Sequence, residues 1–418
     1  MGNTVLSIKG TDFYINDKKV YAEIAGSRKE AHGLLMNARF IQGIFDDSED
    51  PSRFNRFNKS FDTEKNTDDL IAALPEWYAH GLRAFTVGLQ GGGPCFTLFN
   101  EPINNNPFGT DGTSFDLAYA NRLDRLIRAA DDIGMVVIVS FFYFFQAERL
   151  QNGRAVIEAT RTAARFLKSG GYTNVIIEVA NEHDLTKKHS LLEFPEGIVS
   201  LMEIARNESG GLPVGCSSTA PMISEEVAKE SDVVFYHGNG RTRQQYYNDI
   251  CQLKSWAPNS PIVCNEDSQA LGNMEVAVSQ ATSWGYYNNL TKQEPPTDWR
   301  ITEGEDRFFA IRMAKFIGID LPELPFEDQF YLQGFENDIT VDGKRWIRLA
   351  SLYPESIDYV EFFKNGELEH LSYDDPFFIN FVFNWYQGPT LVSSEDKEWK
   401  AVIHLKSGEV LEKKAVLK

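Results

Sequence analysis

The chain has 418 residues, of which 42% are apolar and 13% aromatic, so its length allows one large domain and a smaller one around a substantial core. A peptide-like or disulfide-stapled scaffold is therefore excluded. Its 60 acidic residues outnumber its 41 basic ones and give a formal charge of −19, which together with the lack of any basic run excludes nucleic acid as a partner.

The N-terminal segment, residues 1–37, contains a predicted β-hairpin at residues 13–20 that closes the floor of the following domain or joins the last one. The first ten residues lack a basic stretch followed by an apolar one, so the protein is either cytoplasmic or has lost its leader. The longest apolar run, residues 135–145, contains Ser140 and is too short to span a bilayer. Membrane insertion is therefore not expected.

Between residues 40 and 317, short runs rich in β-branched and aromatic residues alternate with segments of helical period, which is typical of repeated βα units. Strands are predicted at residues 40–45, 82–89, 135–142, 175–180, 213–218, 233–236, 261–264 and 284–287, and helices at 67–80, 117–133, 152–169, 196–207, 224–231, 243–256, 273–283 and 303–317. Eight such units predict an α/β fold, a (β/α)8 TIM barrel over residues 38–320. An open doubly wound sheet is the alternative.

The glycine-rich run at residues 91–94 follows the second predicted strand but leads into an irregular segment, so a phosphate-binding loop is a weak interpretation. A loop on the top face of the barrel fits better. The segment from residue 91 to 113 is long enough to wall one end of a site there, which would favour a pocket and attack at chain ends over an open cleft.

Residues 325–418 change character to alternating strands separated by turn signals such as Asn365-Gly366 and Ser407-Gly408. We expect a smaller all-β C-terminal domain here, a β-sandwich that resembles bacterial immunoglobulin-like modules without the cysteine pair of antibody domains. Packing against the barrel is its simplest role, and carbohydrate binding is the other.

Two apolar strands each deliver a glutamate at their C-terminal end. Glu182 follows the strand at residues 175–180, and Glu266 follows the strand at residues 261–264. By strand count they stand at the fourth and seventh strands, and the C-terminal ends of all barrel strands meet at one catalytic rim. Two facing carboxyls are what cleavage of a glycosidic bond requires, one as proton donor and one as nucleophile or base.

With its Asn181-Glu182 pair at strand four and Glu266 at strand seven, the chain resembles the clan A glycoside hydrolases, closest in style to the family 5 cellulase-like enzymes. The resemblance implies a retaining glycoside hydrolase acting on β-glycosidic bonds of a polysaccharide or oligosaccharide. It also implies that Glu182 is the general acid/base, that Glu266 is the nucleophile and that Asn181 binds the sugar 2-hydroxyl. An acidic enzyme of this kind suits a secreted or periplasmic setting with its leader removed, and a cytoplasmic one remains an alternative.

Further substrate-binding candidates surround the pair: Arg39, Tyr143, His237, Arg241 and Trp284. His237 closes the sixth strand, where the family often places a histidine, and Trp284 opens the eighth, where it commonly has an aromatic platform under the sugar. The tyrosine that follows this histidine in the family is missing, so Arg241 or Asn239 is expected to keep Glu266 ionised. Arg39 directly precedes the first predicted strand, and Tyr143 directly follows the third.

No metal or cofactor site is predicted. HExxH, CxxC and clustered His/Asp patterns are missing, and the four cysteines, Cys95, Cys216, Cys251 and Cys264, are expected to be reduced core residues. The resembled family also needs no cofactor for catalysis. The departures from its pattern leave a second hypothesis, a catalytically degenerate barrel that binds carbohydrate, and a third, a transglycosylase.

Overall fold

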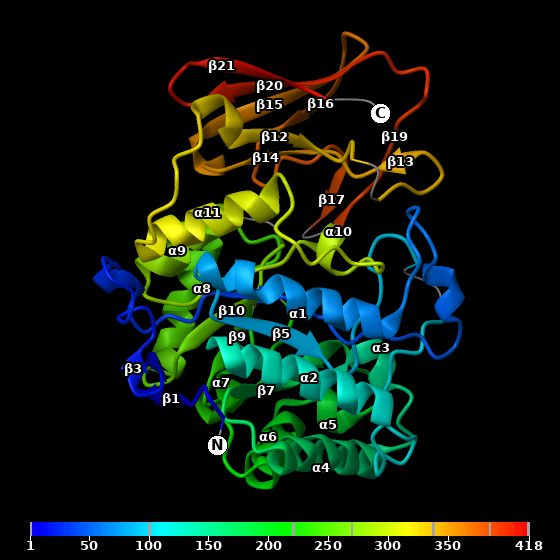
Figure 1. The fold of residues 1–418 in the computed structure, drawn as a ribbon, viewed down its shortest axis with the longest axis vertical. Helices are drawn as coiled ribbons and strands as arrows, with labels where there is room; N and C mark the ends of the chain where they lie inside the picture. The colour runs from blue at the N-terminus through cyan, green and yellow to red at the C-terminus, as the bar shows by residue number, and fades with distance from the viewer. Residues whose placement is uncertain are drawn as a thin grey trace.

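The computed structural model describes residues 2–98, 102–219, 222–268, 271–336, 339–383 and 386–415. Within these ranges, two regions follow one another along the chain (Figure 1): a mixed α/β region up to α11 (Glu305–Ile317) and an all-β region beyond it. No helix of the described ranges is long and apolar enough to cross a membrane.

The α/β region is built on a parallel sheet of six strands in the order β11-β4-β5-β6-β7-β8. The strands are β4 (Asn37–Arg39), β5 (Ala84–Gly88), β6 (Val136–Tyr143), β7 (Val175–Asn181), β8 (Val214–Gly215) and β11 (Gly285–Tyr286). Every residue of β5 and β7 is buried, as expected for parallel strands covered on both faces.

Two further parallel strands, β9 (Val234–His237) and β10 (Ile262–Glu266), lie between β8 and β11. The Asp232 N–H donates to the Val214 carbonyl at 2.9 Å on one side, and the Cys264 N–H donates to the Ser283 carbonyl at 3.0 Å on the other. These bonds join the strands into a ring, and the region has a TIM-barrel-like fold.

Helices connect successive strands and cover the outside of the ring (Figure 1). They are α1 (Thr63–Ala79), α2 (Leu117–Ile133), α4 (Gly153–Gly170), α6 (Pro195–Ser209), α7 (Glu225–Glu230), α8 (Arg243–Trp256), α9 (Leu271–Ser279) and α11, with α3 (Phe144–Ala147), α5 (Ser190–Glu193) and α10 (Asn289–Lys292) in the loops. Side chains of Asp62, Asp116, Asn152 and Ser224 cap helix N-termini, and left-handed Gly134 and Gly318 end α2 and α11.

The first predicted strand, residues 40–45, is wrong in position. The strand is β4, which ends at Arg39, and residues 40–45 form turns in which the Gly43 N–H bonds the Phe40 carbonyl at 2.8 Å. Their apolar side chains are buried as in a strand: Phe40 and Ile44 join the main core, whereas Phe45 belongs to a small separate cluster, where the Phe45 and Phe54 rings are 4.9 Å apart. A short apolar run cannot distinguish these two kinds of burial.

The predicted N-terminal hairpin is part of a three-stranded sheet in the structure. Its strands are β1 (Leu6–Lys9), β2 (Asp12–Ile15) and β3 (Lys18–Lys19). The Leu6 N–H donates to the Thr173 carbonyl at 2.9 Å, just before β7 begins, and the Tyr21 hydroxyl donates to the Gly81 carbonyl at 2.8 Å, just before β5. The hairpin therefore closes the floor of the ring, at the N-terminal ends of its strands.

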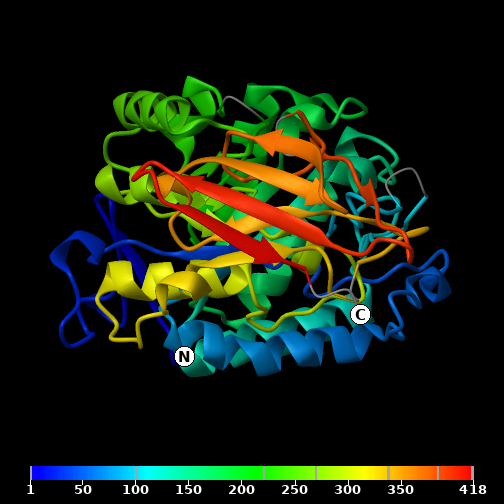
Figure 2. The same ribbon diagram turned by 90° about the horizontal axis from the view of Figure 1, so that it is seen from above.

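The all-β region contains a four-stranded antiparallel sheet in the order β16-β15-β20-β21, which lies across the α/β region when seen from above (Figure 2). These strands are β15 (Ile357–Lys364), β16 (Glu367–Ser372), β20 (Trp399–Leu405) and β21 (Val410–Lys414), and the shorter ones are β12 (Phe330–Gln333), β13 (Lys344–Arg345), β14 (Arg348–Ser351), β17 (Phe381–Phe383), β18 (Tyr386–Gln387) and β19 (Thr390–Leu391). Left-handed Asn365 and Gly366 form the predicted turn between β15 and β16.

The two regions meet through buried ion pairs and hydrogen bonds. Arg348 Nη2 lies 2.7 Å from Glu305 Oε1, with both side chains buried, and Asp375 accepts the Gly272 N–H at 3.1 Å. The all-β region nevertheless has its own apolar core, which runs from Phe330 to Leu405.

The four cysteines are free thiols. Cys95, Cys216 and Cys264 are buried as predicted, whereas Cys251 is exposed on α8. The prediction of a core position is therefore wrong for Cys251 alone.

Candidate active site

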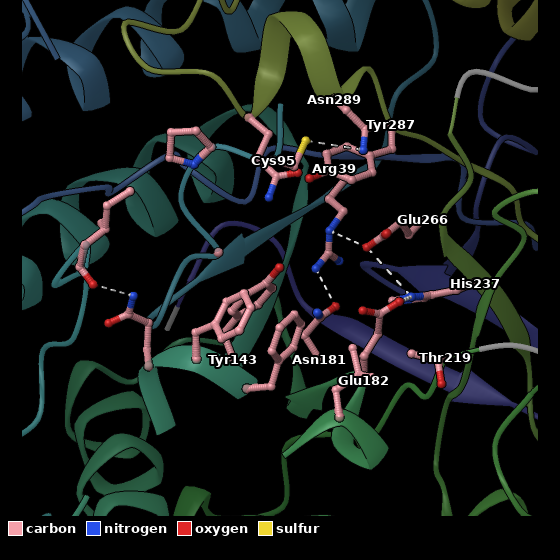
Figure 3. A pocket seen from close by; sticks show the side chains of 18 of the residues that line it. Arg39, Cys95, Tyr143, Asn181, Glu182, Thr219, His237, Glu266, Tyr287 and Asn289 are labelled. Carbon is pink, nitrogen blue, oxygen red and sulfur yellow. Dashed lines mark hydrogen bonds and ion pairs between the residues drawn. The ribbon is translucent and has the colours of Figure 1, made fainter. Parts of the chain in front are cut away.

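The predicted pair of glutamates lies in one cavity of about 640 Å³ at the C-terminal ends of the strands (Figure 3). Glu182 directly follows β7, and Glu266 is the last residue of β10. Both side chains line the cavity, together with the predicted Arg39, Tyr143, Asn181 and His237.

The two carboxylates are close enough to act on one bond. His237 Nδ1 lies 3.2 Å from Glu182 Oε1 and 3.7 Å from Glu266 Oε2. One oxygen of each carboxylate and one nitrogen of His237 all lie within 4.8 Å of one another. Nδ1 of His237 thus lies between the two carboxylates and forms its hydrogen bond with Glu182.

Glu266 is surrounded by donors. Arg39 Nε lies 2.8 Å from Oε2, and the Asn239 amide donates to Oε1 at 2.6 Å. The Asn239 carbonyl oxygen accepts from the Ser268 N–H and hydroxyl, which orients the amide toward Glu266. Burial raises the pKa of the Glu266 carboxyl, but the Arg39 charge, His237 and the Asn239 amide outweigh it, and the net pKa is lowered.

Glu182 has the opposite balance. Burial is the largest influence and raises the pKa of its carboxyl, the hydrogen bond from His237 lowers it in part, and the Glu266 charge raises it again. Its backbone is held in the left-handed region, at φ +46°, where the Glu182 N–H donates to the Ser217 hydroxyl at 3.1 Å. One carboxyl thus retains its proton more readily and the other loses it, the division of roles that acid and nucleophile need.

Asn181 and Tyr143 extend the site on the side of β6 and β7. Asn181 Oδ1 accepts from Arg39 at 2.5 Å, which leaves its NH2 group available to a ligand. The Tyr143 ring stacks on Phe144 with centroids 4.4 Å apart. Gly92 packs against this ring so closely that a Cβ at that position would lie 2.5 Å from Tyr143 Cζ. The glycine-rich run therefore passes close to the Tyr143 ring where a larger residue would not fit.

Trp284 and Arg241, two predicted substrate-binding residues, do not line the cavity. Trp284 is fully buried outside the cavity lining, packs on Phe309 at 5.6 Å and donates its indole N–H to Asp267 at 2.9 Å. Arg241 forms a two-pronged ion pair with Asp249, at 2.7 and 2.9 Å. Asn239, the other candidate named for that role, is the residue that contacts Glu266.

Tyr287 is the residue at the eighth strand that sequence reasoning missed. It lines the cavity, and the Arg39 guanidinium lies 5.5 Å from its ring centroid. Residues 284 and 286 share the face that packs on α11, and residue 287 points the other way, because side chains alternate along a strand. The alternation places Tyr287 and Trp284 on opposite faces, and the structure shows that the face of Tyr287 is the one at the cavity. Other lining residues without a predicted role include Pro94, Cys95, Leu98, Phe144, Phe145, Thr219, Asn289 and Gln293.

Glu182, His237 and Glu266 are also spaced closely enough to hold a cation. Both oxygens of Glu266 already accept bonds from Arg39 or Asn239, and the Arg39 charge opposes a second cation. The donor set therefore fits an acid and nucleophile pair better than a metal centre.

No protein-family model matches the chain, and none of the curated proteins resembles it in sequence. Among solved structures, it is similar in fold to a candidate glycoside hydrolase from Bacteroides vulgatus, with a TM-score of 0.50, 10% identity, and coverage of 93% of this chain and 80% of that one. For the β-glucuronidase of Parabacteroides merdae, the TM-score is 0.44 and the identity 11%, and the match covers 98% of this chain and 50% of that one. For the endo-β-1,4-mannanase of Thermotoga petrophila, the TM-score is 0.44 and the identity 11%, and the match covers 91% of this chain and 96% of that one. The chain spans about half the length of the β-glucuronidase.

Proposed function

We propose that the protein is a retaining glycoside hydrolase that cleaves β-glycosidic bonds of a polysaccharide or oligosaccharide. The observation that carries this proposal is the pair of carboxylates with oxygens within 4.8 Å and oppositely shifted pKa values. Retaining enzymes have carboxyl groups roughly 5 to 5.5 Å apart, whereas inverting ones need roughly 6.5 to 9.5 Å to admit a water between them.

In the first step, the Glu266 carboxylate attacks the anomeric carbon while the bond to the leaving oxygen breaks. Glu182 gives its proton to that oxygen, and a glycosyl ester of Glu266 remains. In the second step, Glu182 takes a proton from water, the resulting hydroxide attacks the same carbon, and Glu266 is released. The Asn181 amide, by the family resemblance, holds the 2-hydroxyl.

The test is covalent capture of the intermediate. A 2-deoxy-2-fluoro β-glycoside with a good leaving group should esterify Glu266, and peptide mapping by mass spectrometry locates the label. Glu182→Gln and Glu266→Gln should each lower turnover of ordinary β-glycosides by at least roughly a hundredfold with the fold intact. Full activity in either variant would contradict the proposal.

A sugar-binding protein without catalysis is the competing function. It is suggested by the missing tyrosine after His237, but Arg39 and Asn239 supply donors to Glu266. It would be favoured if ligands bind without turnover and if Glu266→Gln leaves the dissociation constant unchanged.

We further propose membership of family 5 in clan A, with an N-terminal segment at 1–37, a barrel at 38–320 and an immunoglobulin-like sandwich at 325–418. The separate apolar core of the last region supports this division. Calorimetry should then resolve two unfolding transitions, and a single transition would argue against two independent units.

A further inference from the structure

One wall of the cavity is formed by the segment after β5, which contributes Gly92, Pro94, Cys95 and Leu98 to the lining. This segment has no regular secondary structure, so its position depends on contacts with other parts of the chain. We call residues 92–98 the cavity wall.

From the barrel side, a buried carboxylate holds the wall. Glu294 Oε1 accepts the Cys95 and Phe96 N–H groups at 2.9 and 2.8 Å, and Oε2 accepts the Thr97 hydroxyl. Arg56 neutralises this carboxylate at 3.3 Å. Gln293 adds a bond to the Gly93 carbonyl at 3.0 Å. This fixes the backbone of the wall at its inner edge.

From the other side, the all-β region reaches the wall through Trp346. Its ring lies 5.7 Å from that of Phe96, and the two belong to an apolar cluster with Leu290 of α10 and Phe378 of the all-β region. Trp346 is buried, and its indole N–H donates to the Gln387 carbonyl at 3.1 Å, which fixes the ring to its own region. Phe96 is thus held between the two regions.

We propose that Trp346 is a positioning residue for the substrate cavity: by packing on Phe96 it holds the cavity wall against the site, so that the all-β region completes the substrate-binding surface. Trp346 touches neither glutamate, and its action passes through Phe96 to Cys95 and Leu98. The kinetic part of this inference rests on the proposed function, whereas its structural part does not.

A readout independent of activity is available in Cys95, which is 6% exposed and adjacent to Phe96. Burial raises the pKa of its thiol, which slows reaction with thiol reagents. In a Cys251→Ser background, which removes the exposed thiol, the remaining Cys216 and Cys264 are fully buried. Labelling kinetics in this background therefore report mainly on the wall.

Trp346→Ala should raise the labelling rate of Cys95 by roughly tenfold, because a local opening of the wall becomes easier. Phe96→Ala should do the same, and the double variant should add little, since both remove one contact. Trp346→Phe, which keeps an aromatic ring, should restore most of the protection. Trp399→Phe, in the separate core of the all-β region, is the control for a general loss of stability.

With a β-glycoside that the parent cleaves, Trp346→Ala should raise KM by roughly five- to tenfold and change kcat by less than about threefold, because the wall contacts substrate but not the reacting atoms.

The proposal is overturned if Cys95 labelling is unchanged, if Trp399→Phe accelerates it equally, or if the effects of Phe96→Ala and Trp346→Ala add. If Trp346→Ala does not fold, the Cys95 labelling rates of Phe96→Ala and Trp346→Phe test the proposal instead. If the parent cleaves no glycoside, the proposed function fails while the labelling still decides the role of Trp346.

Discussion

Glu182 and Glu266 are the same residue type at the ends of two strands of the same ring, yet their surroundings are opposite. Arg39 and the Asn239 amide bond Glu266. Among the described residues, the side-chain partner of the Glu182 carboxyl is the shared His237, and burial is the largest influence on the pKa of this carboxyl. The difference teaches that a pocket can assign the roles of acid and nucleophile through which donors reach which carboxylate, even when burial acts on both.

The largest expected effect comes from replacing each glutamate and varying the leaving group. Glu266→Gln should lower kcat by roughly 10⁴-fold or more on every substrate, because no nucleophile remains. Glu182→Gln should lower kcat by roughly 10² to 10⁴-fold on substrates with poor leaving groups. With an activated aryl glycoside, whose leaving group departs without a proton, the rate of the first step should fall far less. Pre-steady-state kinetics measure that step. The same leaving-group dependence in both variants would contradict the division of roles.

The second effect concerns Arg39, whose charge lowers the pKa of Glu266, the proposed nucleophile. Arg39→Met should raise the pKa of Glu266, so the acidic limb of the profile of kcat/KM against pH should move to higher pH, and activity at neutral pH should fall by roughly 10²-fold. Arg241→Gln is the matched control, since Arg241 pairs with Asp249 outside the cavity. An unmoved acidic limb in Arg39→Met would mean that Glu266 is kept ionised by other groups.

How far the sequence predicts this site depends on which residues lie on the strands. Glu182, Glu266 and His237 follow from the apolar runs before them, because the ends of parallel strands must meet at one rim. The partner of Glu266 does not follow, since Asn239 and Arg241 lie in one loop and only its folded course decides between them. The wrong position of Trp284 arises because the sequence does not say which face of one short strand points into the cavity. The wrong boundary of β4 arises because the apolar residues 40–45 are buried in turns and not in a strand.

His237 is shared, so its removal should affect both carboxyls together. It lowers the pKa of Glu182 and of Glu266, and His237→Leu should therefore move both limbs of the pH profile to higher pH, whereas Arg39→Met moves mainly the acidic one. We expect kcat to fall by roughly tenfold to a hundredfold. Movement of only one limb would show that the histidine serves a single carboxyl.

The smallest effects separate the two aromatic residues at the eighth strand. Tyr287 lines the cavity, so Tyr287→Phe should lower kcat/KM by a few fold without changing the melting temperature, because the change removes one hydroxyl from a lining residue and keeps its ring. Trp284→Phe should instead cost about 1 to 3 kcal/mol of stability, since it removes buried contacts and the bond to Asp267, and leave kcat/KM nearly unchanged. Thermal unfolding and steady-state kinetics on both variants measure this. If Trp284→Phe weakened catalysis more than Tyr287→Phe did, the sugar platform predicted for Trp284 would be restored, and the parity argument that assigns the cavity to Tyr287 would fail.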